Sequence, residues 1–258
     1  MFVDTLTHPT LNGKWIDNRE GDTFEDLYKL AKSHNVISCC AVGLPEVGDY
    51  DHKGYYEKAA SFNDFFYPVA PITKTNIVDI INEIDDIKTI GFDAIKIHQR
   101  LLRKNFSHED LSKIFKKCYE CNMKVFYCTY FHCHTSKIPN EDPFFTLASA
   151  LKNSPQIKII LLHGGGVELL KYCELARFNE NILIDLSLTL MKYDGSSIDK
   201  DILFLFNNFD RKITIGSDHP EWDYGNILKK LRHMLSNISE EKAKNITSVN
   251  ALRFLDYT

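Results

Sequence analysis

Reactive side chains recur in this sequence at the points where short apolar runs end. The polar segments are Asp4-Thr5-Leu6-Thr7-His8, Lys96-Ile97-His98, Cys128 with the following His132-Cys133-His134, His163-Gly164-Gly165-Gly166, and Gly216-Ser217-Asp218-His219-Pro220. Histidine and aspartate serve as general acids and bases, and both residues, like cysteine thiolate, can bind zinc. Chance could place one or two such residues at the ends of runs, whereas five indicate a common site.

Three of these residues are the candidate catalytic groups. We predict that Asp218 activates water as a general base, or ligates a metal if one is bound. His163 precedes three glycines that we expect to begin a helix, which would bring backbone donors to an oxyanion or a substrate carboxylate. His8 is expected to act with His163 in polarising a carbonyl group. The structural alternatives are a helix-capping role for Asp218 and a loop-holding core role for His163.

Other polar and aromatic residues at the same ends are candidates for substrate binding. Lys96 and His98 are the first of these, because a buried lysine needs an acidic partner or loses its proton. That partner could be part of the fold or an acidic substrate. Further candidates lie around the expected pocket: His132, His134 and His219 at its rim, Trp15, Tyr130, Phe131 and Trp222 in its walls, and Arg100 or Arg103 as a carboxylate anchor.

The apolar runs themselves predict an α/β fold of the (β/α)8 TIM-barrel type in a single domain, residues 1–258. The expected strands are Met1–Thr5, Val36–Leu44, Phe66–Ile72, Phe92–His98, Lys124–Tyr130, Ile157–His163, Asn181–Ser187 and Lys212–Asp218. Helical spacing marks Thr23–His34, Asn76–Ile90, Ser107–Asn122, Val167–Phe178 and Asp199–Asn208, and Ser239–Tyr257 reads as a closing helix. This alternation is typical of parallel strands with helical crossovers, whose reactive groups gather at the C-terminal strand ends. An open doubly wound sheet is the alternative, but no glycine-rich phosphate loop follows the first run.

The order of the motifs resembles the amidohydrolase-related barrels, a group of small hydrolases and decarboxylases. Their first strand reads Asp-x-His-x-His, the fourth ends in Lys-Leu-His, the sixth in His-Gly-Gly, and the eighth carries Gly-Ser-Asp-x-Pro. The matching segments here begin at Asp4, Lys96, His163 and Gly216, and Asn250-Ala251 matches the closing helix. The resemblance covers essentially the whole chain and implies the barrel fold and an enzyme.

Two metal ligands of that family are replaced in this sequence. The resemblance implies a divalent metal, usually zinc, held by two histidines of the first strand, one of the fifth and the aspartate of the eighth. Leu6 stands where the first histidine would be and Cys128 where the strand-five histidine would be. The set that remains is His8, Asp218 and Cys128, and a catalytic zinc needs three protein ligands plus an open position. A metal held by these three and a site without metal both stay open.

The composition narrows the partners and the compartment. The chain carries a formal net charge of −4, which gives no general attraction to nucleic acid or anionic membranes. We find no signal-peptide pattern and no apolar stretch of the ~18 residues that a spanning helix needs. The seven scattered cysteines fit reduced thiols, and Cys118-x-x-Cys121 lies in a helical pattern without a second such pair. We therefore expect a cytoplasmic protein with a small-molecule substrate, and a homo-oligomer is compatible with the sequence.

These observations predict a hydrolase that cleaves a C–O or C–N bond in a small lactone, ester or amide. Two alternatives remain. A non-oxidative decarboxylase would need a metal or a cationic pocket to hold the carboxylate. The replacements at Leu6 and Cys128 also fit a catalytically silent barrel that binds a ligand.

Overall fold

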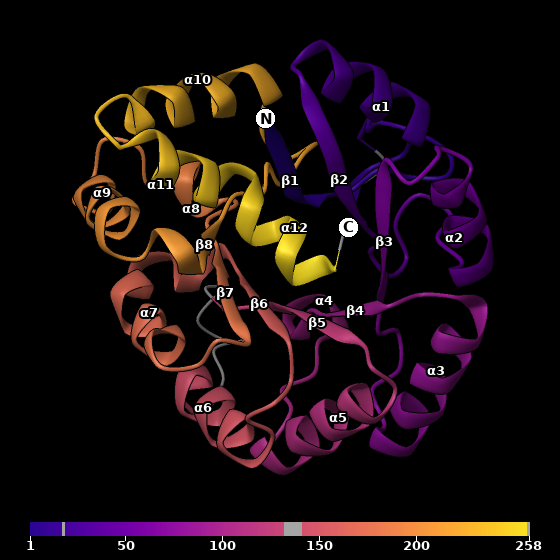
Figure 1. Cartoon of the computed structure of the whole chain (residues 1–258). Coiled ribbons are helices and arrows are strands. Elements are labelled where there is room, and N and C mark those ends of the chain that lie inside the picture. The colour runs from indigo at the N-terminus through magenta and orange to yellow at the C-terminus, as the bar shows by residue number, and fades with distance from the viewer. Residues whose placement is uncertain (17–18, 132–140, 257–258) are drawn as a thin grey trace.

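The computed structural model describes residues 1–16, 19–131 and 141–256, which form a parallel barrel. Its strands follow one another in the order β1 to β8 (Figure 1). Their bounds are Phe2–Thr7, Val36–Val42, Phe66–Pro71, Ala94–Ile97, Lys124–Cys128, Ile159–Leu162, Ile182–Asp185 and Ile213–Thr214. Each lies within or against a run predicted from the sequence.

Backbone hydrogen bonds between the first and last strands close the sheet. Thr5 N–H donates to Ile215 O at 3.2 Å, Asp218 N–H to Leu6 O at 2.9 Å, and His8 N–H to His219 O at 2.8 Å. The predicted TIM barrel is therefore confirmed, and the open doubly wound sheet is wrong. Closure also brings the segment Leu6–His8 against Ser217–His219, although the two segments are over two hundred residues apart in the sequence.

The helices on the outside of the barrel begin where the sequence offers a capping side chain. Thr23 and Asp26 form a reciprocal capping box at the start of α1. Ser107 Oγ accepts from Asp110 N–H at α5, which is half of the box predicted there. The helices are α1 Phe24–Ser33, α2 His52–Ala60, α3 Ile77–Ile90, α4 Gln99–Leu102, α5 His108–Glu120, α6 Pro143–Asn153, α7 Leu169–Arg177, α8 Thr189–Lys192, α9 Ile198–Asn208, α10 Tyr224–Leu235, α11 Glu240–Lys244 and α12 Asn250–Leu255.

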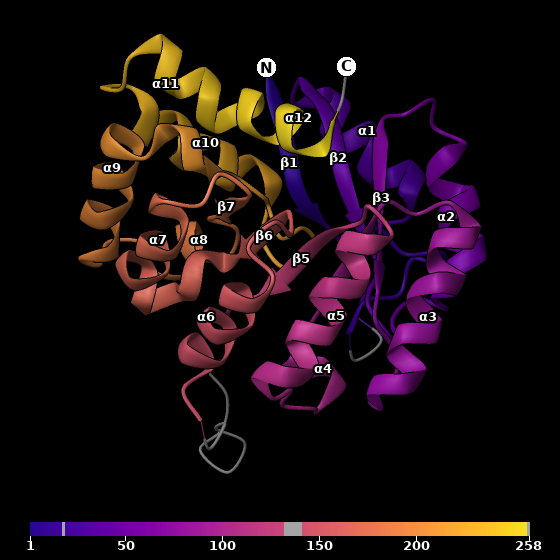
Figure 2. The ribbon, with the colours of Figure 1, turned by 60° about the horizontal axis from the view of Figure 1, so that its bottom comes forward.

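The C-terminal segment covers the N-terminal end of the barrel. Ser239 caps α11 as predicted, and the closing helix continues to Leu255 through a π-helical turn at Asn245–Val249, which joins α11 to α12. Asn250 Nδ2 donates to Ile213 O at 2.7 Å, and Phe254 and Leu255 pack against the apolar floor of the barrel. Figure 2 shows α12 at this end and α4 at the opposite one. The N-terminal end is therefore closed, and the C-terminal strand ends are the face that carries the loops.

The apolar interior is divided into two layers by the strands. Inside the barrel, Leu6, Phe126 and Leu162 belong to a compact cluster, while a larger cluster fills the space between strands and helices. The described cysteines are free thiols, and Cys118 is buried on α5, as expected for a structural residue. No helix in the described part of the chain has the length and apolar character needed to cross a membrane.

Candidate active site

Six polar residues meet at the C-terminal ends of the strands, above the apolar floor. We call them the polar cluster: His8, Lys96, His98, Cys128, His163 and Asp218. All are buried, with exposed fractions from 1% for Lys96 to 7% for Asp218. The strand register explains part of the arrangement, because Lys96 pairs with Phe126, and alternate side chains then bring His98 and Cys128 to the next level on the same inner side.

His8 lies between Lys96 and Asp218 with its tautomer fixed by the backbone. Its Nδ1–H donates to Val42 O at 2.6 Å. Nε2 then carries the lone pair, and it lies 3.4 Å from Lys96 Nζ and 3.5 Å from Asp218 Oδ1. Burial, together with the charge of Lys96, lowers the pKa of His8 to about 4, so the ring is neutral at pH 7. Because Nε2 accepts a hydrogen bond rather than donating one, the geometry does not favour the oxyanion role expected for His8.

Asp218 is an ionised carboxylate held by a left-handed backbone. Its φ is 58°, and its N–H is anchored to Leu6 O. Burial alone would raise the pKa of the carboxyl group, but the neighbouring charges of His163 and Lys96 contribute to holding it well below its usual value. A non-glycine residue in this conformation costs of the order of 1–3 kcal/mol, and such strain is concentrated at functional sites. Asp218 therefore presents a negative charge to the pocket at neutral pH.

Lys96 is the cation of the polar cluster. Burial lowers its pKa to about 8, while Cys128 and Asp218 oppose that shift by favouring the charged form. The ammonium group therefore remains mainly protonated at pH 7, and it donates to His8 Nε2. An ammonium in this position can stabilise negative charge that develops on a substrate oxygen.

Cys128, the last residue of β5, interacts with two imidazole rings. Burial would raise the pKa of the thiol, but hydrogen bonds and charge interactions with His98 and His163 lower it well below its ordinary value. Burial alone would lower the pKa of His163, but its interactions with Cys128 outweigh burial, so the pKa is raised overall. The pKa of His98 is lowered, with burial as the largest cause. Cys128 and His163 therefore each favour the charged form of the other, and the Cys128 thiol also lies 3.9 Å from Tyr130 O.

A second pair of residues, which the sequence analysis did not single out, holds His163. Ser187 Oγ lies 3.0 Å from His163 Nδ1 and donates a short hydrogen bond to Asp185 Oδ1. Asp185 also accepts from Ser187 N–H at 3.0 Å and from Thr5 Oγ1 at 2.7 Å. Both residues end the predicted seventh run, and the sequence signal was the polar Asp-Leu-Ser at the end of an otherwise apolar strand.

The glycines after His163 do not begin a helix, so that expectation is wrong. Gly164, Gly165 and Gly166 all have positive φ, and α7 begins at Leu169. Gly165 N–H donates to Thr129 Oγ1 at 2.7 Å and is not free for a substrate oxyanion. A side chain at Gly165 would overlap the ring of Tyr172, with its Cβ 2.1 Å from Cδ2, so the glycine is required by a close contact. The loop serves to turn the His163 ring into the barrel.

The polar cluster does not fit a divalent metal. No three His, Cys, Asp or Glu residues in the described ranges are placed to hold an ion. Leu6 is fully buried in the apolar floor, and Lys96 Nζ faces His8 Nε2, the atom that would have to bind the metal. A zinc ion held by His8, Asp218 and Cys128 would therefore meet an ammonium group at the position that it needs. We derive no chemical step through a metal.

The remaining sequence candidates lie at varied distances from this cluster. His219 forms a short hydrogen bond with Asp22, which ties the loop after β8 to the loop before α1. Tyr130 stands edge-on to the His163 ring, with ring centroids 6.4 Å apart. The Arg100 guanidinium lies over the Tyr130 ring, 5.2 Å from the ring centroid. Trp222 packs against the apolar layer between strands and helices. His132 and His134 lie outside the described residues.

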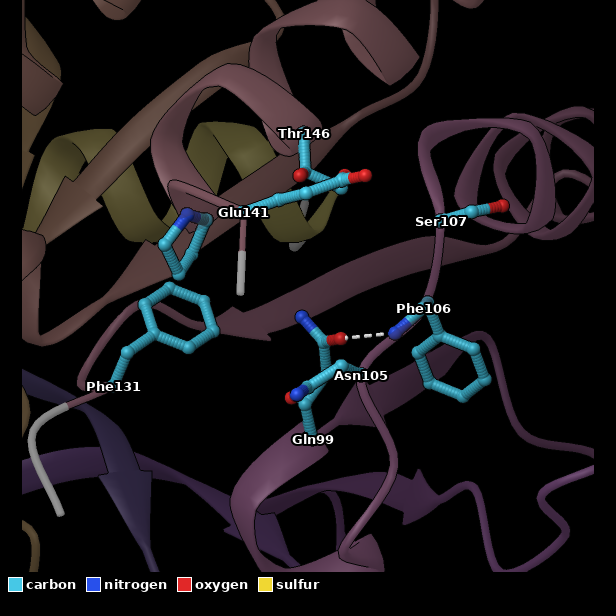
Figure 3. Close-up of a pocket in the computed structure, with 8 residues that line it drawn as sticks. Gln99, Asn105, Phe106, Ser107, Phe131, Glu141 and Thr146 are labelled. Atoms are coloured by element: carbon cyan, nitrogen blue, oxygen red, sulfur yellow. Dashed lines mark hydrogen bonds between the residues drawn. The ribbon is translucent and has the colours of Figure 1, made fainter. Parts of the chain in front are cut away.

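Two hollows open near the strand ends. The first, of about 240 Å³, is lined by Gln99, Phe131, Glu141 and their neighbours (Figure 3). There Gln99 Oε1 accepts from Phe106 N–H, and Gln99 Nε2 donates to Tyr127 OH. None of the polar cluster lines this hollow.

The second hollow is a cleft of about 730 Å³ whose lining includes Trp15, Arg100 and Arg103. Trp15 also lines a small cavity with His8, and the two rings lie 5.5 Å apart. The buried Trp15 indole N–H has no partner in the part of the chain that the structure describes. The cleft therefore lies beside the small cavity that His8 lines, and none of the polar cluster lines the cleft itself.

Comparison with known proteins places the fold. No family model matches the chain, and no curated protein matches its sequence. Solved structures do match over nearly its full length. An uncharacterised TIM-barrel protein from Bordetella bronchiseptica superposes with a TM-score of 0.82 at 15% identity, covering 99% of this chain and 98% of that one. This chain therefore has the fold of a TIM barrel.

Two further structures of that type carry named activities. A protein described as a candidate 2-pyrone-4,6-dicarboxylic acid hydrolase from Pseudomonas putida has a TM-score of 0.71 at 10% identity, covering 99% and 97% of the two chains. A 5-carboxyvanillate decarboxylase from Novosphingobium aromaticivorans, solved with manganese, has a TM-score of 0.61 at 11% identity, covering 89% and 80%. At these identities the likeness shows the shared fold, and the activity of this chain has to be argued from its own residues.

Proposed function

We propose that this protein is an amidohydrolase-superfamily enzyme that hydrolyses a lactone, ester or amide bond in a small metabolite without a metal. The observation that supports this most directly is that a buried ammonium group, Lys96, and a buried carboxylate, Asp218, both lie next to His8 Nε2. One group is a cation that can stabilise an oxyanion, and the other is a carboxylate that can orient and deprotonate water. Hydrolysis of a carbonyl compound needs both of these functions.

The roles follow from the charges of the groups. Lys96 donates to the carbonyl oxygen, where negative charge develops in the tetrahedral transition state. Asp218 accepts the proton of the attacking water. His8 accepts from Lys96 and holds the ammonium in place, so it is a positioning residue in this scheme. Removal of one such oxyanion donor lowers turnover by roughly 10²–10³-fold in well-studied hydrolases.

We further propose a substrate that carries a carboxylate. Arg100 and Arg103 line the cleft beside the small cavity of His8, and an arginine guanidinium binds a carboxylate through two parallel hydrogen bonds. The hydrolase-like neighbour is named for a dicarboxylic acid, which supports the same substrate class. The aromatic ring of Trp15 would form one wall, and its free N–H offers a donor.

A non-oxidative decarboxylase is the second candidate. Lys96 supplies the cationic pocket that such an enzyme needs if no metal is bound, and one neighbour of the same fold is a decarboxylase. The polar cluster favours hydrolysis over this alternative, because the ionised Asp218 would repel a carboxylate placed beside it. A decarboxylase substrate would have to approach Lys96 from the side away from Asp218.

A substrate panel distinguishes these functions. The purified protein is incubated with chelator and with aliphatic and aromatic lactones, esters, amides and carboxylic acids, and the products are followed by mass spectrometry. We expect turnover of carboxylate-bearing lactones or esters, with loss of turnover in Lys96→Met. Release of carbon dioxide without hydrolysis would establish the decarboxylase instead, and absence of any turnover would support the silent barrel.

A further inference from the structure

A further hollow, of about 500 Å³, opens at the N-terminal end of the barrel. Its lining comes from the residues where β6, β7 and β8 begin and from α12, which crosses this end (Figures 1 and 2). Leu183 of β7 and Phe254 of α12 give it an apolar inner part, since both are buried and belong to the cluster inside the barrel. The hollow therefore lies at the end opposite the polar cluster, and its volume is that of a small-molecule site.

Cationic side chains dominate the lining of this hollow, which we call the basic hollow. Five of them face one acidic residue of the lining, Glu180. The five are Lys158, Arg177, Arg211, Lys212 and Arg253. The chain as a whole has a formal net charge of −4, so this concentration of positive charge runs against the overall balance. A concave surface lined by one sign of charge focuses the electric field and raises the local concentration of ions of the opposite sign.

Ion pairs within the fold involve three of the five cations. Lys158 pairs with Asp256 at 2.8 Å, and Arg211 lies 3.7 Å from an exposed glutamate. Arg177 donates to Glu174 through Nε and Nη2, so this pair does not use Nη1. These contacts hold the side chains around the hollow, and they lie at exposed positions where ion pairs contribute little to stability.

Lys212 and Arg253 form no ion pair in the part of the chain that the structure describes. Lys212 Nζ donates to Asn179 O at 2.7 Å, which fixes the ammonium group but supplies no negative charge. Burial lowers the pKa of Lys212, and the charge of Arg253 adds to that effect while Glu180 opposes it. The two cations therefore repel each other, which is a cost that an anion bound between them would remove.

An exposed aromatic ring stands beside these cations. Phe178 follows the last residue of α7, lines the hollow and is 91% exposed. Its neighbour Arg177 lies over the ring of Phe209, 4.4 Å from the centroid, so the guanidinium next to Phe178 is held in place. A ring of this kind offers a face on which a nucleobase can stack.

From these observations we propose that the basic hollow binds a small molecule with two or more phosphate groups, such as a nucleoside diphosphate. Guanidinium groups match the geometry of phosphate oxygens through paired hydrogen bonds, and an ammonium group adds a point charge. Five cations against one carboxylate balance more than one negative charge, which favours a diphosphate over a monocarboxylate. The proposal does not rest on the proposed hydrolysis, because the two sites lie at opposite ends of the barrel.

Isothermal titration calorimetry with ADP and with pyrophosphate, in chelator at neutral pH and low salt, tests the proposal on the whole chain. We expect both compounds to bind the wild type. Arg253→Gln should weaken binding of both by roughly 10-fold or more, because a charge-assisted hydrogen bond is lost. Arg253→Gln combined with Lys212→Gln should abolish binding. Phe178→Ala should weaken the binding of ADP and leave that of pyrophosphate unchanged.

Two arginine variants are the controls, and both should bind like the wild type. Arg232→Gln removes an exposed arginine of α10 outside the hollow, and Arg103→Gln removes one from the cleft at the other end of the barrel. Thermal melting of each variant shows that it is folded.

The outcomes separate this inference from the proposed function. Failure of the wild type to bind either compound, unchanged binding in the double variant, or loss of binding in Arg103→Gln would overturn the site. Unchanged binding of ADP in Phe178→Ala would reject the nucleoside and assign the hollow to inorganic diphosphate. The substrate panel is read from products and not from binding at this end, so the failure of one proposal does not decide the other.

Discussion

Lys96 offers a sharp test of the charge arrangement, because its burial should appear in the pH dependence of stability. The side chain is 1% exposed, and burial lowers its pKa from 10.5 to about 8 in the folded protein. The titratable groups that influence it are Asp218, Cys128, Asp185 and Arg100. We predict that wild type gains stability relative to Lys96→Met between pH 8 and 10.5.

The sign follows from proton counts. Between these two pH values Lys96 is protonated in the unfolded chain and neutral in the folded one, so the unfolded state binds more protons and the free energy of unfolding rises with pH. The gain in the free energy of unfolding of wild type relative to Lys96→Met is thus fully present above pH 10.5 and is lost as the pH falls through 8. The magnitude is about 3 kcal/mol, since each pKa unit corresponds to about 1.4 kcal/mol.

Urea unfolding at pH 7.5, 8.5, 9.5 and 10.5 measures the difference between the two proteins directly. Taking the difference cancels the buried tyrosines and cysteines, whose raised pKa values lower stability at alkaline pH in both proteins. Lys116→Met, at an exposed position on α5, is the control for loss of one lysine. Parallel curves for wild type and Lys96→Met would show that the ammonium is not desolvated, and its placement beside His8 would then be refuted.

Three further predictions test the other parts of the site. Asp218→Asn should keep the fold and lower hydrolysis by roughly 100-fold or more, and a fully active variant in a steady-state assay would remove Asp218 from the mechanism. The purified protein should contain divalent metal well below one equivalent per chain by elemental analysis, and one firmly held zinc in the wild type would contradict this expectation. The double variant Leu6→His, Cys128→His should bind zinc tightly only after Lys96 is also replaced. Gly216→Ala should destabilise the protein by about 1–3 kcal/mol in urea unfolding, because the new Cβ would lie 2.6 Å from Leu6 Cβ; an unchanged midpoint would show that the β1–β8 contact is looser than described.

The fold was predictable because burial on both faces makes parallel strands continuous apolar runs. All eight strands lie at the predicted places, and the main differences concern ends. The run Lys212–Asp218 is a strand only at Ile213–Thr214, since the chain leaves the ladder where Asp218 adopts a positive φ. Helices α2, α6 and α10 were not predicted. The pattern of α2 is weak, but α10 has buried apolar residues at helical spacing from Tyr224 to Met234, a signal that the sequence analysis missed.

The polar cluster could be predicted only in part, for a reason of geometry. Strand ends placed the residues at one face, but the hydrogen bonds that assign their protons come from neighbours that the sequence does not mark. Ser187 follows β7 whereas His163 follows β6, and His98 Nδ1 accepts from Leu101 N–H inside a helix of four residues. The expected helix after His163 is wrong because the three glycines adopt positive φ. The expected oxyanion role of His8 stays a prediction that the Nε2 acceptor geometry does not favour.

The substitutions at positions 6 and 128 become coherent when Lys96 is considered with them. A divalent ion in such a site would supply positive charge for the oxyanion and would bind and activate the water. Lys96 can supply the charge, since its ammonium lies at the nitrogen that would bind the ion. It cannot bind or activate a nucleophile, because an ammonium group has no acceptor and no open coordination position. In the proposed mechanism Asp218 fills that remaining role by deprotonating water, so Lys96 and Asp218 divide between them the two functions of a metal, and Leu6 fills the place where the first histidine would stand.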